Sequence, residues 1–272
     1  MDGPSRQTNR RQEVREYIDT VFTRLLSPGL FRSRLPGFIS QCAVCRSWPA
    51  RQVCLPCEVR FAPAQRRCER CALALPADLP MGFQVNHGLC PACIRQPPPL
   101  NRVLTAVPYA YPWSDLITRY KFGEQHGWAS FFAALLLRAP GVPQVFADLQ
   151  PNDRVLALPL SAERLQTRGF NQAWELASAL ARQSQTRAKT DARLLLRVKN
   201  TPAQSQLKRE ARLANVKGIF QVDPLRVAEI KGRRVVLVDD VMTSGASMFT
   251  AAQALREAGA THITGVVLAR TE

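Results

Sequence analysis

An acid pair followed by small hydroxyl residues is the segment of this 272-residue sequence whose residue types best suit chemistry. The run Val235–Val238 is apolar, and Asp239 and Asp240 follow it. The next small residues are Thr243, Ser244, Gly245, Ala246 and Ser247. Small side chains let consecutive backbone N–H groups approach an anion, and the start of a following helix adds partial positive charge. The sequence therefore predicts a phosphate-binding loop between a strand and a helix.

The acid pair indicates what carries the phosphate. Two carboxylates beside a phosphate would repel it unless a sugar separated them from it. In that case the carboxylates accept hydrogen bonds from the sugar hydroxyls, so we expect a ribose lying over Asp239 and Asp240. The alternative is an aspartate N-cap with ordinary loop chemistry. A cap does not require two acids after four apolar residues, which favours the ribose.

Eight cysteines lie between Cys42 and Cys93, and all of them fall in CxxC pairs. The pairs are Cys42/Cys45, Cys54/Cys57, Cys68/Cys71 and Cys90/Cys93. Two thiolates at this spacing on a tight turn can bind one tetrahedral metal, and two such pairs complete a four-sulfur site. We expect two zinc ribbons in which consecutive pairs share an ion.

The cysteine spacing leaves alternatives open. Interleaved pairing, an iron centre or iron–sulfur cluster, and a redox dithiol would use the same sulfurs. A segment of this size with little apolar content hardly folds without such staples, which favours structural zinc. Four cysteine ligands leave no position for a catalytic water.

The elements that position the loop alternate from about residue 100 onward. Apolar strands are expected at residues 103–111, 154–159, 235–238 and 263–268, and helices at 113–120, 128–138, 171–183 and 248–258. This alternation predicts an α/β fold with a mainly parallel sheet covered by helices on both faces. Ligands of such sheets bind at the carboxyl ends of the strands, where the acid pair stands.

We expect three parts in the chain. Residues 1–37 form an extension with a short amphipathic helix at about 12–26, residues 38–97 form the double ribbon, and residues 98–272 form the α/β domain. A run of three prolines separates the last two parts as a stiff spacer. No stretch approaches 18 unbroken apolar residues, and the start of the sequence lacks the apolar core of a secretory signal. We therefore expect a cytoplasmic protein without membrane insertion.

The charge balance favours an acidic partner. Lys and Arg number 37 against 21 Asp and Glu, which gives a formal net charge of +16. This excess suits the phosphates of a small ligand or a nucleic acid backbone. An arginine-rich composition also arises simply from a GC-rich genome.

The sequence resembles the ComF/ComFC family, also called GntX-like, over about residues 42–271. This family joins a double zinc ribbon to a type I phosphoribosyltransferase domain. The resemblance rests on the CxxC pairs and on a series of short motifs further along the chain. These are Tyr120-Lys121-Phe122-Gly123, Leu158-Pro159-Leu160, Arg168-Gly169-Phe170-Asn171-Gln172, Arg197, Thr201-Pro202-Ala203-Gln204, Leu207, Arg212, Asn215, Phe220 and Val235–Ser247. Two departures are mild: the loop reads Thr-Ser-Gly-Ala-Ser where the family often has Thr-Thr-Gly-Ala-Thr, and Ser161 replaces a common histidine.

The resemblance implies that the loop binds phosphoribosyl pyrophosphate (PRPP), with Mg²⁺ bridging the pyrophosphate and the ribose hydroxyls. Asp239 and Asp240 would then orient the ribose. Lys121, Arg164 and Arg168 would contact the pyrophosphate, although snorkelling or surface roles are open for these three cations. The basic segment 197–217 would form a mobile hood over the site that excludes water.

The resemblance also implies a link to DNA uptake in natural transformation, and a phosphoribosyltransferase activity. The sequence shows no identifiable nucleobase pocket, and no N-terminal cysteine nucleophile for glutamine hydrolysis. Two alternatives without transferase activity therefore stand beside the enzyme: a single-stranded DNA-binding competence protein, and a regulator that senses PRPP. The DNA alternative also implies the DNA-uptake machinery as a partner.

Overall fold

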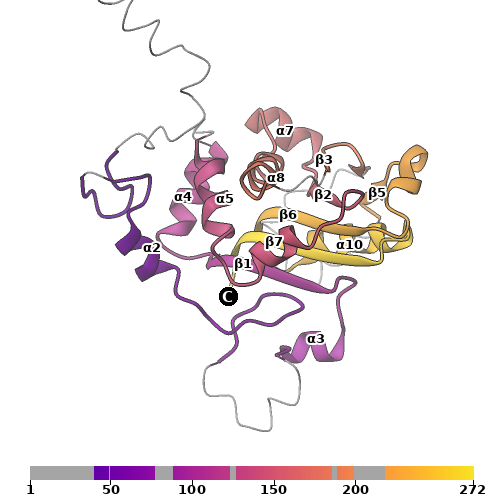
Figure 1. The fold of residues 1–272 in the computed structure, drawn as a ribbon, viewed down its shortest axis with the longest axis horizontal. Coiled ribbons are helices and arrows are strands. Elements are labelled where there is room, and N and C mark those ends of the chain that lie inside the picture. Colours follow the sequence, from indigo (N-terminus) through magenta and orange to yellow (C-terminus); the bar gives the residue numbers. More distant parts are fainter. Residues whose placement is uncertain (1–39, 49, 77–87, 123–126, 186–188, 199–217) are drawn as a thin grey trace, which may run out of the picture. The chain divides into compact units, whose positions relative to one another are not determined.

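A computed structural model of the chain describes residues 40–48, 50–76, 88–122, 127–185, 189–198 and 218–272 (Figure 1). It divides into two compact units, Met1–Cys54 and Leu55–Glu272. The helix expected at residues 12–26 and most of the hood expected at 197–217 lie outside the described residues. The domain boundaries at residues 37 and 97 stay predictions.

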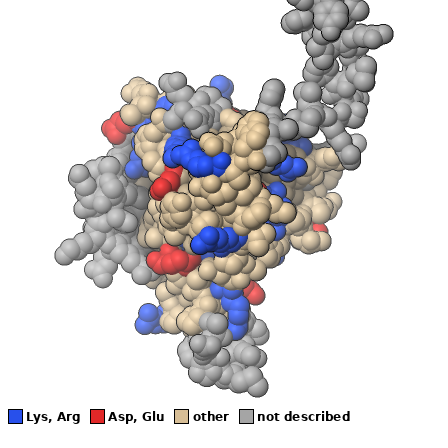
Figure 2. Space-filling view, turned by 90° about the vertical axis from the view of Figure 1, so that its left-hand side faces the viewer, with Lys and Arg blue, Asp and Glu red and all other residues tan. Residues whose placement is uncertain are grey.

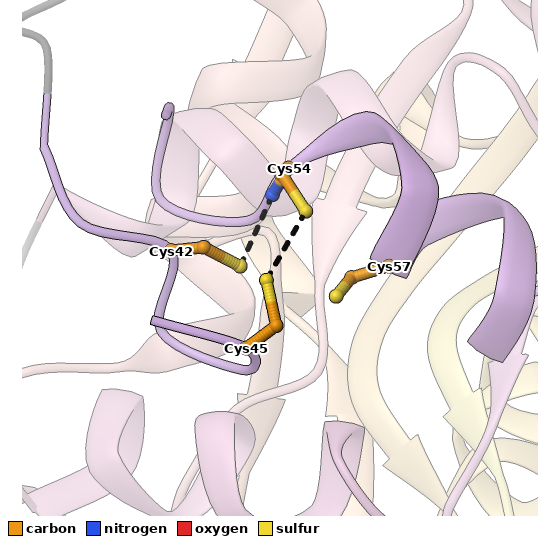
Figure 3. Close-up of side chains that lie close together, drawn as sticks. All are labelled: Cys42, Cys45, Cys54 and Cys57. Atoms are coloured by element: carbon orange, nitrogen blue, oxygen red, sulfur yellow. Dashed lines mark hydrogen bonds between the residues drawn. The ribbon is translucent and has the colours of Figure 1, made fainter. Parts of the chain in front are cut away.

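In the first unit, a short hairpin closed by Ser40 and Ala50 carries the first CxxC pair. The backbone N–H and C=O groups of Ser40 and Ala50 bond each other, both at 2.7 Å. Within the enclosed turn, the N–H of Arg46 donates to the carbonyl of Cys42 at 3.0 Å. This turn brings the side chains of Cys42 and Cys45 to the same side of the hairpin (Figure 3).

A parallel five-stranded sheet forms the centre of the second unit, as the sequence predicts (Figure 1). Its strands lie in the order β1-β7-β6-β2-β3, and every neighbouring pair is parallel. Their bounds are β1 Arg102–Pro108, β7 His262–Arg270, β6 Arg234–Met242, β2 Arg154–Ala157 and β3 Lys189–Asp191. A separate antiparallel pair consists of β4 (Leu195–Arg197) and β5 (Phe220–Val222).

Of the helices in the second unit, α5, α8 and α10 pack against strands of this sheet. The helix bounds are α2 Leu55–Phe61, α3 Pro91–Arg95, α4 Trp113–Phe122, α5 Trp128–Leu136, α6 Val142–Ala147, α7 Ala162–Arg168, α8 Gln172–Gln183 and α10 Ala246–Glu257, with a 3₁₀ helix at Pro224–Glu229. The helix after the loop thus begins two residues before the expected position 248. None of the described helices is both long and apolar enough to cross a membrane.

Both faces of β6 are buried, which explains its apolar run. Val235 and Leu237 belong to a core that also contains Met248 of α10. Val236 and Val238 alternate with them and are equally buried, and α8 also contacts β6. The strand continues through the acid pair to Met242, so it is longer than the expected 235–238. The acid pair therefore stands on a rigid strand end rather than in a loop.

The second group of cysteines is part of that same core. Cys68, Cys71, Cys90 and Cys93 are buried, and they pack in one continuous cluster with residues of β6, β7 and α10. These cysteines therefore share one hydrophobic core with the sheet.

Candidate functional site

A cavity of about 360 Å³ opens at the carboxyl ends of β2 and β6. All ten residues that the sequence predicts for the acid pair, the loop and the cations line it: Lys121, Arg164, Arg168, Asp239, Asp240, Thr243, Ser244, Gly245, Ala246 and Ser247. They come from α4, α7, the end of β6, the loop that follows it and the first turn of α10. Parallel strands direct their carboxyl ends to one edge of the sheet, so segments far apart in sequence meet there.

The loop between β6 and α10 favours glycine at position 245, because its backbone is left-handed and nearby side chains leave little room. Gly245 has φ +82°, in the left-handed region. A Cβ atom there would lie 2.6 Å from the side chains of Met242 and Phe249. The hydroxyl of Ser244 accepts from the N–H of Ala246 at 3.4 Å. The chain thus approaches the cavity with its backbone and starts α10 directly behind it, which is the geometry that binds anions.

The two carboxyl groups of the acid pair differ in their protonation. Burial and the adjacent charge of Asp240 raise the pKa of Asp239 well above its ordinary value. Burial also acts to raise the pKa of Asp240, but the ammonium of Lys121 at 2.8 Å outweighs it, and the pKa of Asp240 lies below its ordinary value. One carboxylate is therefore ionised beside the loop, while its neighbour holds a proton more readily.

Helix α4 positions Lys121 by burying the residue before it. Tyr120 is fully buried, and its hydroxyl donates to the carbonyl of Gln172 at 2.8 Å. This anchor places Lys121 over the acid pair. The next residue, Phe122, is 64% exposed, and the guanidinium carbon of Arg168 lies 5.0 Å from its ring centroid.

Helix α7 carries the two predicted arginines one turn apart. It begins at Ser161, whose hydroxyl accepts from the N–H of Arg164 at 3.4 Å, so the serine at this position acts as an N-cap. Arg168 donates to Oε1 of Gln172 at 3.1 Å. Burial lowers the pKa of Arg168. The charge of Asp240 acts in the opposite direction, and repulsion from Arg164 lowers the pKa further. Crowded cations of this kind favour an anion between them.

Arg197 of β4 also lines the cavity, together with Tyr109 and residues 158–160. The sequence predicts Arg197 as the first residue of the hood and not as part of the cavity wall. Burial and the charge of Arg164 lower its pKa. Its place in the cavity wall depends on a three-residue strand that periodicity cannot reveal.

The cysteines form two groups of four, each made of consecutive CxxC pairs. In the first group, the Sγ atoms of Cys42, Cys45, Cys54 and Cys57 lie within 4.8 Å of one another (Figure 3). The Sγ atoms of Cys45 and Cys54 are 3.6 Å apart, and the N–H of Cys54 donates to Sγ of Cys42 at 3.3 Å. Hydrogen bonds with Ser47 lower the pKa of Cys45 to about 6, which favours the thiolate.

The second group has the same geometry at Cys68, Cys71, Cys90 and Cys93. The Sγ atoms of Cys71 and Cys90 are 3.6 Å apart, and the N–H of Cys90 donates to Sγ of Cys68 at 3.2 Å. A zinc ion with Zn–S bonds of about 2.3 Å holds its sulfurs about 3.8 Å apart. Both groups therefore fit zinc ions, and the structure favours the consecutive pairing over the interleaved one.

Comparisons with known proteins agree with this architecture. Residues 166–272 match the family described as "Phosphoribosyl transferase domain". The chain is 31% identical over 237 residues to "DNA utilization protein YhgH" of Escherichia coli O6:H1, covering 87% of this chain and 98% of that protein. It is 32% identical over 181 residues to "Competence protein F" of Haemophilus influenzae, covering 66% and 78%. It is 29% identical over 184 residues to "Competence protein ComFC" of Bacillus subtilis, covering 65% and 69%.

The parallel sheet and the matched family define a domain of the phosphoribosyltransferase type. Two cysteine groups precede this domain in the sequence, and the similarity to the relatives extends over most of the chain. The chain therefore belongs to the ComF family.

Proposed function

We propose that this protein binds PRPP in the cavity at the end of β6. The observation that carries the proposal is the meeting of all ten predicted residues in that one cavity, around a loop in which Gly245 has a left-handed backbone. The loop N–H groups would hold the 5-phosphate, and Asp239 and Asp240 would accept from the ribose hydroxyls. Lys121, Arg164, Arg168 and Arg197 would surround the pyrophosphate.

The same arrangement suits transfer of the phosphoribosyl group. When pyrophosphate leaves C1′, negative charge grows on its bridging oxygen, and fixed cations at that place lower the barrier. Bound Mg²⁺ would supply further charge neutralisation, and carboxylates are ligands that it accepts. The chain's own part is to fix the sugar through the acid pair and to hold the leaving group beside the arginines. The hood expected at residues 197–217 would exclude water.

The relatives' names connect this chain to DNA handling, and we propose a role in DNA uptake. Of the three relatives named above, two are called competence proteins and one is called a DNA utilization protein. The net charge of +16 supports contact with a nucleic acid backbone. Figure 2 shows Lys and Arg in separate groups across one face, with fewer acidic side chains among them. On this face, the charge does not gather in one groove.

Calorimetric titration of PRPP with Mg²⁺ tests the binding proposal. We expect Asp240→Asn to weaken binding at least about tenfold, because a hydrogen bond to a charged group contributes about 1.5–3 kcal/mol. Asp115→Asn is the matched control, since Asp115 is an exposed aspartate of α4. Equal affinities of wild type and Asp240→Asn would contradict the role of the acid pair.

Two further measurements separate the candidate functions. Release of pyrophosphate in the presence of a panel of amines and bases would support a transferase, and its absence despite tight PRPP binding would support a sensing regulator. Binding of single-stranded DNA that falls steeply with salt would support the DNA-binding role. No DNA binding even at low salt would reject that role.

A further inference from the structure

Arg270, the last residue of β7, has a buried guanidinium that contacts two functional segments at once. Its Nε donates to the carbonyl oxygen of Cys71, in the second cysteine group, at 2.9 Å. Its Nη1 donates to the carbonyls of Met242 at 3.2 Å and Thr243 at 2.5 Å, where the phosphate loop begins, and also to that of Thr271. Arg270 is only 7% exposed, so water competes little for these bonds.

These bonds orient the phosphate loop. A planar trans peptide holds its C=O and N–H groups on opposite sides. The carbonyls of Met242 and Thr243 share their peptides with the N–H groups of Thr243 and Ser244. Because Arg270 holds both carbonyls, both N–H groups must point away from it. Thr243 and Ser244 line the cavity, so Arg270 sets the direction of two donors that the proposed 5-phosphate would use.

The cysteine turn is held from the same side. The peptide whose carbonyl Arg270 binds also contains the N–H of Ala72, which donates to the carbonyl of Cys68 at 2.7 Å. Arg67 donates to the next carbonyl, that of Ala72, at 2.9 Å, and pairs with Glu272 at 2.8 Å. The turn between the first two cysteines of this group therefore depends on contacts from the end of β7.

The charge of Arg270 completes the relationship. Among the described residues, no carboxylate forms an ion pair with it. A buried cation without a counter-ion is unfavourable. Four thiolates around a divalent metal carry a net charge of −2, and a phosphate in the loop is a second anion. Each of these two anions would stabilise the buried guanidinium in its present position, and in that position Arg270 also orients the binding site of the other anion.

We propose that Arg270 couples the second cysteine group to the phosphate loop, so that bound metal and bound sugar phosphate stabilise each other. This inference rests on the proposed function, because it takes the loop to bind a phosphorylated ribose. Arg270 acts here as a positioning residue for both sites. Such coupling is reciprocal by linkage, so the sugar phosphate must slow metal loss by the factor by which metal strengthens sugar phosphate binding, if association rates are unchanged.

The test is the rate at which the full-length, zinc-loaded protein loses zinc to an excess of coloured chelator, with and without saturating ribose 5-phosphate. We expect two release phases, the slower from the buried second group. Ribose 5-phosphate should slow that phase about 5- to 20-fold in the wild type. In Arg270→Gln this ratio should fall below about twofold, and Arg270→Lys, which keeps the charge, should retain an intermediate ratio.

Arg256→Gln is the matched control. Arg256 also donates to backbone carbonyls, those of Pro99, Ala260 and Thr261, but it contacts neither the loop nor a cysteine. This variant should keep the wild-type ratio. A purely structural role of Arg270 would speed zinc loss equally with and without ligand and leave the ratio unchanged, which would overturn the coupling.

Calorimetry with ribose 5-phosphate distinguishes a failure of the proposed coupling from a failure of the proposed function. Binding by the wild type together with an unchanged zinc-release rate overturns the coupling alone. No binding by the wild type overturns the coupling and the proposed function together. If circular dichroism shows that Arg270→Gln does not fold, Arg270→Lys decides, and an undiminished ratio in that variant contradicts the proposal.

Discussion

The ammonium nitrogen of Lys121 lies 2.8 Å from Oδ2 of Asp240, although more than a hundred residues separate them in the sequence. Their side chains are only 18% and 12% exposed, so solvent screens the pair weakly. The lysine holds the pKa of Asp240 below its ordinary value in spite of burial. The consequence is an ionised carboxylate fixed beside the β6–α10 loop before any ligand arrives.

Lys121→Met should destabilise the protein by roughly 3 kcal/mol, because it leaves the buried carboxylate of Asp240 without its counter-ion. The double variant Lys121→Met/Asp240→Asn should be more stable than Lys121→Met. Urea unfolding of the two single variants and the double variant measures this coupling. Additive effects of the two substitutions would contradict a direct ion pair.

Asp239→Asn should stabilise the protein at pH 7 by about 0.5–2 kcal/mol and weaken PRPP binding, as is common for residues kept for function. The pKa of Asp239 is raised in the folded protein, so the folded state binds this proton more tightly than the unfolded chain. The free energy of unfolding must then fall as pH rises from the unfolded-state value near 3.8 through the folded pKa. Asp239→Asn should lose this part of the pH dependence, whereas Asp115→Asn should keep it.

Gly245→Ala should cost about 2–4 kcal/mol, since it combines a left-handed backbone with 2.6 Å contacts that force the side chains of Met242 and Phe249 to shift. Gly232→Ala is the control, because Gly232 has φ +73° but nothing within 4 Å of an added Cβ. It should cost only about 1 kcal/mol. Thermal unfolding compares them, and equal losses would show that the crowding at Gly245 relaxes freely.

The metal content should be about two zinc ions per chain. Cys45→Ser and Cys90→Ser should each remove one. Cys90 is buried in the core that includes the sheet, whereas Cys45 is exposed, so Cys90→Ser should lower the thermal midpoint more. Elemental analysis and thermal scans check this. Iron, or one zinc shared by both groups, would contradict the assignment of two separate zinc sites.

The sequence predicts the part of the fold and site that local patterns encode. The apolar run before Asp239 predicts a buried parallel strand. A helix cap is also local: Asn171 is the N-cap of α8, and its side chain accepts from the N–H of Ala173 at 3.0 Å. Gly259, directly after the C-cap of α10, has φ +92°, a conformation that glycine adopts readily. The consecutive pairing of the CxxC motifs is likewise confirmed.

Features that depend on tertiary contacts were beyond the sequence. Strands β3, β4 and β5 have three residues each, too few for a periodicity. Arg197 and Arg270 look like ordinary arginines in the sequence. Only the folded chain places the first in the cavity wall and the second between Cys71 and Thr243.

The most direct test of the central claim is a crystal structure of the protein with PRPP and Mg²⁺. We expect the 5-phosphate to lie against the N–H groups of residues 243–247. The ribose hydroxyls should lie within hydrogen-bonding distance of Asp239 or Asp240. The pyrophosphate should lie beside Lys121, Arg164 and Arg168. Ligand bound outside this cavity, or bound in it with the pyrophosphate in the loop, would contradict the account.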